Sequence, residues 1–295
     1  MHTTGKIEDR VFGMTERLPP LPIVTRESKE YDLLSVSVDG AEVAYAQQGR
    51  LALPPLVLLH GWGASHKFWK YCFSAFSPRW RVIAPDLVGF GLSEKPDRDY
   101  GVEALAVWLG KFLDALKLDR IALVGHSMGG TISLIYAMAH PERIRKLAVV
   151  NPLIAGATAF NARTKMCLLP GIRGLLFWGS RIPMIRRWVA KDFSYVAKYD
   201  DDLSKDLIRG SYQSTFASLI SASRTDLRPR LGSLAVETLA IGTDKDQLVA
   251  PDQVGLVPAH YRELIPETGH IPMIERPAEF NRILNNFLSI PEQGP

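Results

Sequence analysis

Short apolar runs recur along the chain, and they predict strands that are covered on both faces. The runs show no alternation of apolar and polar residues, as is typical of strands inside a parallel sheet. Segments with helical periodicity, at residues 102–116, 131–139 and 278–288, lie between or after the runs. This alternation predicts a mostly parallel α/β sheet flanked by helices. The expected strands are residues 56–59, 81–84, 121–124, 147–150 and 239–241, with a further strand-like segment at 261–265.

The amino-terminal part of the chain has a different pattern. Residues 34–38 and 41–46 alternate between apolar and polar, and Asp39-Gly40 between them is a hairpin-type turn. We therefore expect an antiparallel hairpin that opens the sheet. Residues 1–31 are polar, of mixed charge and rich in proline, which predicts an extended arm. They lack the apolar centre of a signal peptide, so we expect a cytoplasmic protein.

One long stretch interrupts the alternation of strands and helices. Residues 152–231 contain no strand-like run, but they hold short helix-like pieces, many aromatic residues and helix breakers such as Pro170-Gly171 and Pro183. Their apolar content argues against a disordered loop. We predict a helical cap over residues 152–231, inserted into a core formed by residues 32–151 and 232–295.

Composition narrows the classes of function. The 295 residues are 46% hydrophobic and 22% charged, as in an ordinary globular protein. The net charge of +4 is spread along the chain without a basic run, which argues against a nucleic-acid partner. Cys72 and Cys167 support neither a disulfide framework nor a metal site. We expect no metal, no cofactor and no transmembrane segment, and the oligomeric state stays open.

The sequence Gly-His-Ser-Met-Gly-Gly at residues 125–130 is the strongest chemical signal. It follows the strand-like run at 121–124 and precedes a helical pattern, so it places Ser127 on a sharp turn between strand and helix. Gly125 and Gly129 lack Cβ atoms, which lets strand and helix approach closely. The helix N-terminus beside the hydroxyl favours negative charge. The pattern predicts a nucleophilic serine.

A serine hydroxyl needs a base, and the base needs an orienting acid. His270 lies in a loop after the segment at 261–265, which gives its imidazole the reach of a base; His126, beside the serine, should point away from it. Asp244 and Asp246 both follow the strand at 239–241, and either can supply the acid. The chain order Ser, Asp, His is the order found in one hydrolase type.

Five motifs together resemble the α/β-hydrolase fold family, over about residues 32–288. They are His60-Gly-Trp-Gly63, residues 85–93, residues 125–130, residues 242–249 and residues 269–277. The resemblance favours Asp246 as the acid, because Asp246-Gln-Leu-Val matches the usual context. Some relatives carry the acid after the strand before the cap, but Asn151 stands there.

The resemblance also implies the donors that bind the oxyanion of the reaction. These are the backbone N–H groups of Met128, after the serine, and of Trp62, in the glycine-rich loop. It further implies that His60 braces this loop and that Asp86 is structural.

Ser127 at the turn excludes the relatives that use an aspartate nucleophile, namely haloalkane dehalogenases and epoxide hydrolases. We expect a serine hydrolase, esterase- or lipase-like, that cleaves small-molecule carboxylic esters with apolar acyl or aryl groups through an acyl-enzyme. The alternative is a C–C bond hydrolase for diketone-type substrates, or a cofactor-independent lyase or haloperoxidase, with the same residues. A non-catalytic binding protein is less favoured.

Residues 168–189 mix apolar and aromatic side chains with Arg173, Arg181, Arg186 and Arg187. One interpretation is an interfacial surface that contacts lipid. We favour instead a cap segment packed over the pocket with its arginines in solvent, because glycine and proline break the stretch too often for one long amphipathic helix.

Overall fold

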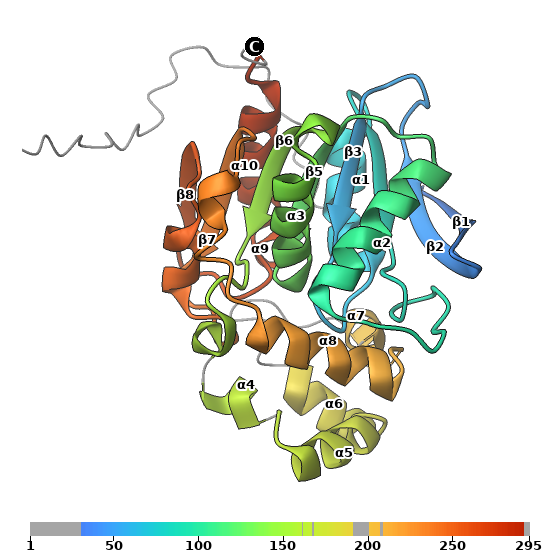
Figure 1. The fold of residues 1–295 in the computed structure, drawn as a ribbon, viewed down its shortest axis with the longest axis vertical. Coiled ribbons are helices and arrows are strands. Elements are labelled where there is room, and N and C mark those ends of the chain that lie inside the picture. The colour runs from blue at the N-terminus through green and yellow to red at the C-terminus, as the bar shows by residue number, and fades with distance from the viewer. Residues whose placement is uncertain (1–30, 161, 167, 191–200, 207–208, 292–295) are drawn as a thin grey trace, which may run out of the picture.

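A single eight-stranded sheet with helices on both faces forms the body of the protein (Figure 1). The computed structural model describes residues 31–160, 162–166, 168–190, 201–206 and 209–291. The strand order is β1-β2-β4-β3-β5-β6-β7-β8. The strands are β1 (Asp32–Val38), β2 (Ala41–Gln48), β3 (Pro55–Leu59), β4 (Arg81–Pro85), β5 (Ile121–His126), β6 (Ile144–Val150), β7 (Thr238–Thr243) and β8 (Tyr261–Ile265).

The pairing of the strands confirms the expected fold class. β1 pairs antiparallel with β2, and β2 pairs antiparallel with β4, whereas all the other neighbouring pairs are parallel. The central strands β5 and β7 are buried at every residue, which explains why their sequences are apolar without alternation. Because β3 and β5 to β8 run in the same direction, the loops that follow them gather at one edge of the sheet.

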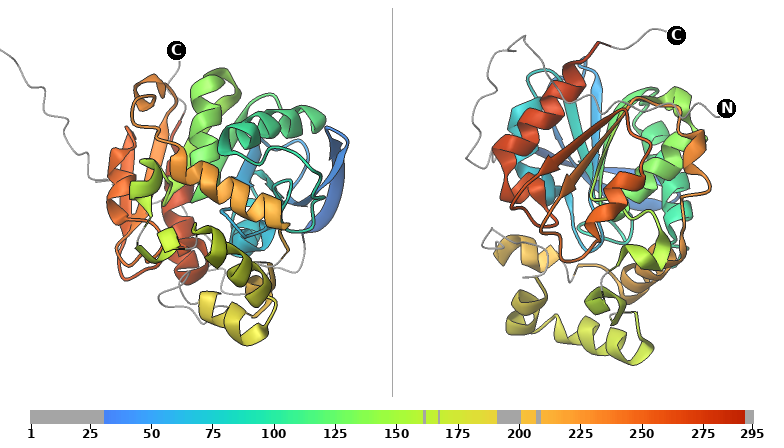
Figure 2. Two further views of the ribbon diagram at one scale, coloured as in Figure 1. Left: turned by 60° about the horizontal axis from the view of Figure 1, so that its bottom comes forward. Right: turned by 90° about the vertical axis from the view of Figure 1, so that its left-hand side faces the viewer.

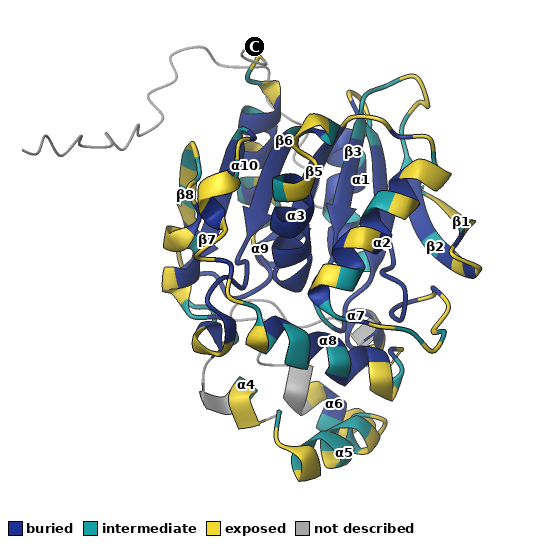
Figure 3. Ribbon diagram, in the orientation of Figure 1, coloured by how far each residue is buried: buried dark blue, intermediate teal, exposed yellow. Residues whose placement is uncertain are grey.

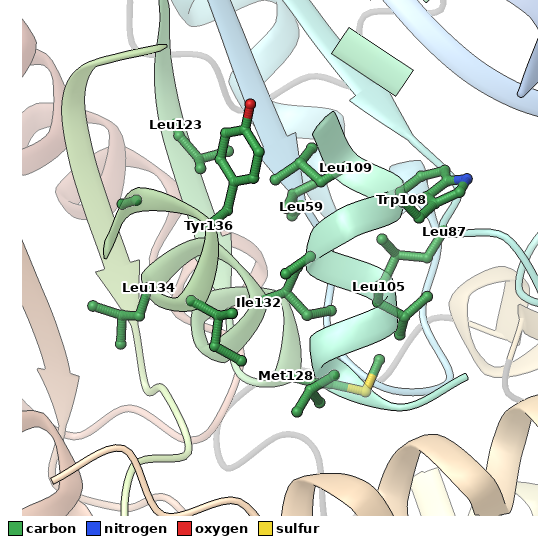
Figure 4. Close-up of a cluster of buried hydrophobic side chains, with 14 of the residues drawn as sticks. Leu59, Leu87, Leu105, Trp108, Leu109, Leu123, Met128, Ile132, Leu134 and Tyr136 are labelled. Atoms are coloured by element: carbon green, nitrogen blue, oxygen red, sulfur yellow. The ribbon is translucent and has the colours of Figure 1, made fainter. Parts of the chain in front are cut away.

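Two layers of helices cover the sheet and bury an apolar core on each face (Figures 2 and 3). Helices α2 and α3 pack on one face, where Trp108 and Tyr136 lie among leucine and isoleucine side chains (Figure 4). Helices α1 and α10 cover the other face, with Trp69 and Phe280 in the second core. The core helices are α1 (Lys70–Phe76), α2 (Val102–Ala115), α3 (Met128–Ala139), α9 (Pro272–Glu275) and α10 (Pro277–Ser289).

In the described part of the segment between β6 and β7, the regular elements are helices joined by loops and turns, and two isolated bridges involve Ala155 and Phe160. Its helices lie across the edge of the sheet at which the parallel strands end (Figure 1). This is the helical cap of the expected fold; its boundaries at 152 and 231 stay a prediction. The cap helices are α4 (Ala162–Met166), α5 (Pro170–Gly179), α6 (Pro183–Ala190), α7 (Asp201–Asp206) and α8 (Tyr212–Arg224).

Buried polar contacts join the cap to the core. Asp206 of α7 accepts a hydrogen bond from Ser65, and Arg209 pairs with the same carboxylate at 3.1 Å. Trp62 donates its indole N–H to the backbone oxygen of Thr215 in α8, at 2.6 Å. The cap is therefore attached to the core through Trp62 in the glycine-rich loop and through Ser65, which follows the loop.

Two sequence-based expectations concern the ends of the molecule and membranes. The predicted amino-terminal arm, residues 1–31, lies outside the described residues except for Tyr31. In the part of the chain that the structure describes, no helix combines the length and the apolar character needed to cross a bilayer.

Candidate active site

Ser127 lies on the sharp turn between β5 and α3. Its backbone has φ 53° and ψ −121°, a conformation that residues other than glycine rarely adopt. The Ser127 N–H donates to the Val150 oxygen at 2.8 Å, which fixes the turn against β6. The side chain of Ser127 lines a cavity between the sheet and the cap. The turn therefore presents the hydroxyl at the N-terminus of α3, as the sequence predicted.

This turn requires glycine at position 129, because the end of the neighbouring strand β3 lies very close to it. A Cβ atom at Gly129 would lie 2.5 Å from the His60 oxygen and 2.6 Å from the Leu59 oxygen. Both contacts are with backbone, so a side chain can be accommodated only by moving β3 or α3. The first turn of α3 is thus held tightly against the end of β3.

We expect Gly129→Ala to destabilise the fold by about 1–3 kcal/mol, the usual cost of overpacking. Gly171→Ala is the matched control, because a Cβ atom there meets nothing within 4 Å and alanine favours the helix. The midpoint of thermal unfolding should fall for the first variant and stay or rise for the second. Equal midpoints for the two variants would contradict the close approach of α3 and β3.

His270 and Asp246 form a buried pair. The Nδ1–H of His270 donates to Oδ2 of Asp246 at 2.6 Å, and both side chains are almost fully buried. The other oxygen, Oδ1, accepts the backbone N–H groups of Leu248 and Val249 at 2.8 and 2.9 Å. The carboxylate is thus fixed by its own loop and in turn fixes the imidazole. Donation from Nδ1 places the lone pair of the neutral ring on Nε2.

The structure distinguishes Asp246 from Asp244, which the sequence left as the second candidate. Asp244 is partly exposed, accepts the N–H of Thr268 at 3.3 Å and lies 3.5 Å from the ammonium of Lys245. It therefore supports the loop that precedes His270. Of the two carboxylates, it is Asp246 whose side chain bonds to the imidazole of His270.

The backbone of His270 is held from behind by two side chains. Its carbonyl oxygen accepts the Nε2–H of His126 at 2.8 Å and the amide of Asn151 at 3.1 Å. Asn151 also donates to Thr243 Oγ1 at 3.0 Å. Burial, and secondarily the nearby His270, lower the pKa of His126 well below its usual value, so its ring is neutral. Both residues position His270, which the sequence did not indicate.

His126 is held by a contact with a residue that is distant in the sequence. The residue lines the same cavity as Ser127, and its ring lies 4.6 Å from the ring of His270, centroid to centroid. The hydrogen bond to the His270 carbonyl holds it there. The acceptor of this hydrogen bond lies 144 residues further along the chain, so the sequence near Ser127 does not indicate it.

The glycine-rich loop abuts the serine. A Cβ atom at Gly61 would lie 3.0 Å from the Ser127 Cβ, and Trp62 and Met128 both line the cavity. His60 is fully buried; its Nε2 accepts the Leu87 N–H at 2.9 Å, and its Nδ1–H donates to the Gly61 oxygen at 2.7 Å. His60 thus ties the loop to the segment that follows β4 and holds Gly61 close to Ser127.

Asp86 and His66 form a second buried pair, which supports the loops and is absent from the cavity lining. Asp86 accepts the backbone N–H and the Nδ1–H of His66 at 2.7 and 2.8 Å, and also the N–H of Leu92 at 2.7 Å. These contacts agree with the structural role expected for Asp86. His66 is buried, with an exposed fraction of 2%.

The cavity beside Ser127 has a volume of about 200 Å³ and an almost wholly apolar wall. The core provides the serine and His270, and the cap provides most of the aromatic and aliphatic surface. Its apolar lining includes Phe160, Leu176, Phe177, Phe216, Leu219 and Val249. Such a cavity binds apolar groups and keeps water away from the polar atoms at its base.

Arg186 is the exception in this apolar wall. It lines the cavity from α6 and is only 8% exposed, so the expectation that the cap arginines lie in solvent is wrong for this residue. Its Nε donates to Ser204 Oγ at 3.4 Å. Among the residues whose side chains the structure describes, which leave out Asp201 and Asp202, no carboxylate lies within ion-pair distance of its guanidinium. The burial of Arg186 could not be predicted from the sequence, because a helical pattern does not show which side of a cap helix faces a cavity.

The described residues contain no group of three or more His, Cys, Asp or Glu side chains arranged to hold a metal ion. Cys72 is a buried thiol of α1, and Cys167 lies outside the described residues.

Comparison with known proteins decides the family. A sequence model of the α/β hydrolase fold matches residues 54–166. The chain is 32% identical over 255 residues to a 2-hydroxy-6-oxo-2,4-heptadienoate hydrolase of Pseudomonas putida, covering 80% of this chain and 89% of that protein. The chain belongs to the α/β-hydrolase fold family. It is a hydrolase of that fold.

Two further similarities mark the range of relatives of this α/β hydrolase. It is 30% identical over 258 residues to a 2-hydroxy-6-oxo-6-phenylhexa-2,4-dienoate hydrolase of Burkholderia cepacia, covering 79% of this chain and 87% of that protein. Among solved structures it is similar to a membrane phospholipase A described as a bacterial virulence factor. The TM-score is 0.76 and the identity 27%, over 88% of this chain and 86% of that one.

Proposed function

We propose that this α/β hydrolase is a serine hydrolase that cleaves carboxylic esters with apolar acyl or aryl groups through an acyl-enzyme on Ser127. One observation carries the proposal: Ser127 and His270, the latter hydrogen-bonded to the buried Asp246, line one apolar cavity. An apolar group in this cavity brings its ester carbonyl to the polar atoms at the base.

In the acylation step, Nε2 of His270 removes the proton from the Ser127 hydroxyl as Oγ attacks the carbonyl carbon of the ester. The electron pair of the C=O bond moves to the oxygen and gives a tetrahedral oxyanion. When the oxyanion collapses, the bond to the alkoxy group breaks, and His270 returns its proton to that oxygen. The alcohol leaves, and the acyl group stays on Ser127 as an ester.

In the deacylation step, a water molecule is the nucleophile. His270 removes a proton from the water as its oxygen attacks the acyl carbon, and it later returns the proton to Oγ of Ser127. The products are the carboxylic acid and the regenerated enzyme. Asp246 accepts the Nδ1–H of His270 and stabilises the imidazolium that forms twice in the cycle.

The oxyanion needs donors that are already in place. The N–H of Met128, at the first turn of α3, and the N–H of Trp62, in the loop that His60 braces, are the groups we assign to it. A single donor of this kind contributes about 10²- to 10³-fold to kcat. The apolar wall around the site strengthens these bonds, because little water competes for the oxyanion.

A second candidate function is hydrolysis of a C–C bond in a keto-diene acid. The names of the two curated relatives describe dienoate hydrolases, whose substrates carry a carboxylate. Arg186 supports this candidate, because it places a buried cation in the wall of an otherwise apolar cavity. A carboxylate bound there would receive a charge-assisted hydrogen bond in a site that contains little water.

Turnover of two substrate sets separates these candidates. Neutral p-nitrophenyl esters of increasing acyl length test the ester hydrolase, and 2-hydroxy-6-oxo-dienoates test the C–C hydrolase. We expect ester turnover that rises with acyl length until the cavity is filled. Cleavage of the dienoates together with no turnover of any ester would reject ester hydrolysis and select the second candidate.

Arg186→Met supplies an independent check, because methionine keeps much of the apolar volume and removes the charge. For neutral esters, kcat and KM should change less than about threefold, since a neutral substrate offers no charge to pair with the guanidinium. For a dienoate, loss of the paired cation should raise KM by at least about 30-fold, following the cost of breaking a buried ion pair. Steady-state kinetics on both substrates measure the difference.

A further inference from the structure

Helix α5 of the cap is apolar on two opposite sides. Ile172, Leu176 and Phe177 line the cavity, whereas Leu175 and Trp178 lie on the other side with exposed fractions of 74% and 66%. No residue of the helix is buried. A helix with apolar residues all round is typical of a buried helix or of one that enters an apolar environment. The cavity accounts for only one of the two faces.

The exposed side of α5 continues into the start of α6. Together they form what we call the outer cap face, which lies at the end of the molecule away from the sheet (Figures 1 and 3). Large apolar side chains scattered singly on a surface are ordinary, but here five occur within residues 169–184, each more than half exposed. They are Leu169, Leu175, Trp178, Ile182 and Met184.

The charge of this part of the chain is of one sign. Residues 151–190 contain no aspartate or glutamate, although 31 acidic residues are spread over the whole chain. They contain six cationic residues, namely Arg163, Lys165, Arg173, Arg181, Arg186 and Arg187. On the outer cap face itself, the guanidinium of Arg181 stacks over the rings of Phe177 and Trp178, at 4.2 and 4.6 Å. Apolar and cationic groups are therefore interleaved.

We propose that the outer cap face docks on an anionic phospholipid surface. Exposed leucine, isoleucine, methionine and tryptophan side chains enter the boundary between headgroups and acyl chains, and the cations beside them pair with lipid phosphates. A second copy of this chain is a poorer occupant, because it would place the same cations against each other. Helix α5 provides both the docking face and a wall of the cavity, so a docked molecule has its cavity beside the lipid.

The test measures co-sedimentation of the full chain with vesicles. Vesicles of phosphatidylglycerol and phosphatidylcholine in equal parts are compared with vesicles of phosphatidylcholine alone. The variant Leu175→Glu/Trp178→Glu removes the apolar contact. Its matched control, Leu51→Glu/Leu264→Glu, changes two leucines outside the cap that are 68% and 58% exposed. All four side chains are exposed, so both variants should fold. Their unfolding midpoints and their ester turnover verify this.

We expect the native chain to bind the anionic vesicles, and this binding should weaken as salt is raised. The cap variant should lose at least about tenfold in vesicle affinity, whereas the control should keep the native affinity. Arg181→Ser should weaken binding about fivefold. The proposal fails if the native chain does not sediment with anionic vesicles, or if the cap variant and its control bind equally. It also fails if the cap substitutions convert a dimer into a monomer and leave vesicle binding unchanged.

Docking on lipid does not depend on the proposed reaction, and the variant Ser127→Ala allows the two proposals to be tested separately. This variant should bind vesicles as the native chain does while it turns over no ester. Loss of vesicle binding with intact turnover of soluble esters rejects docking alone. Vesicle binding by a chain that cleaves no ester rejects ester hydrolysis alone.

Discussion

Ser127→Ala is expected to lower kcat for a neutral p-nitrophenyl ester about 10⁴- to 10⁶-fold, the range seen when an acyl-enzyme nucleophile is removed. The alanine methyl group cannot attack the carbonyl carbon, and the activity that remains comes from the oxyanion donors and from substrate binding. Ser133→Ala is the matched control. Ser133 is a buried serine of the same helix, whose hydroxyl donates to the Gly129 oxygen at 2.7 Å.

The control should keep kcat within about threefold, since its hydroxyl lies outside the cavity lining and its loss costs about one neutral hydrogen bond. Steady-state kinetics of the purified variants measure both changes, and circular dichroism confirms that each is folded. Ester turnover by Ser127→Ala at the native rate would mean that Ser127 does not form the acyl-enzyme.

Asp246→Asn is expected to lower kcat by about 10⁴-fold, as the equivalent change does in serine proteases. The side-chain amide fits the same space, but it favours the ring tautomer with the proton on Nε2 of His270, which then cannot accept the serine proton. The comparison is Asp244→Asn in the same loop. Asp244 bonds to Thr268 and Lys245, so its loss should cost less than about tenfold.

The ratio of the two kcat values tests the assignment of the acid. A larger loss in Asp244→Asn than in Asp246→Asn would show that the 2.6 Å contact with His270 is structural and that the other carboxylate acts on the ring.

Much of the fold was predictable because burial leaves a direct trace in the sequence. Strands covered on both faces, such as β5 and β7, read as unbroken apolar runs, and the amphipathic helices α2 and α10 read as periodic ones. The turn at Ser127 was predictable as well, since two glycines and a serine between strand and helix have a local steric cause. These features depend on neighbours within a few residues.

Features set by distant contacts were not predictable. Nothing near His66 in the chain indicates that Asp86 buries it, and nothing near His126 indicates that its ring bonds to the backbone of His270. Arg186 belongs to a helix whose exposed and buried sides are decided by the cap's position over the cavity. Asp246 and Asp244 are two residues apart, and loop geometry alone separates their contacts.

Covalent labelling of the native chain with a fluorophosphonate, followed by mass spectrometry of the digested protein, tests directly whether Ser127 is the nucleophile. We expect one adduct, on the peptide that contains Ser127. An apolar ester slows its formation by competition, and it is absent from Ser127→Ala. An adduct on a different residue, or efficient ester hydrolysis by a chain that the reagent does not label, would contradict the assignment of Ser127 as the nucleophile.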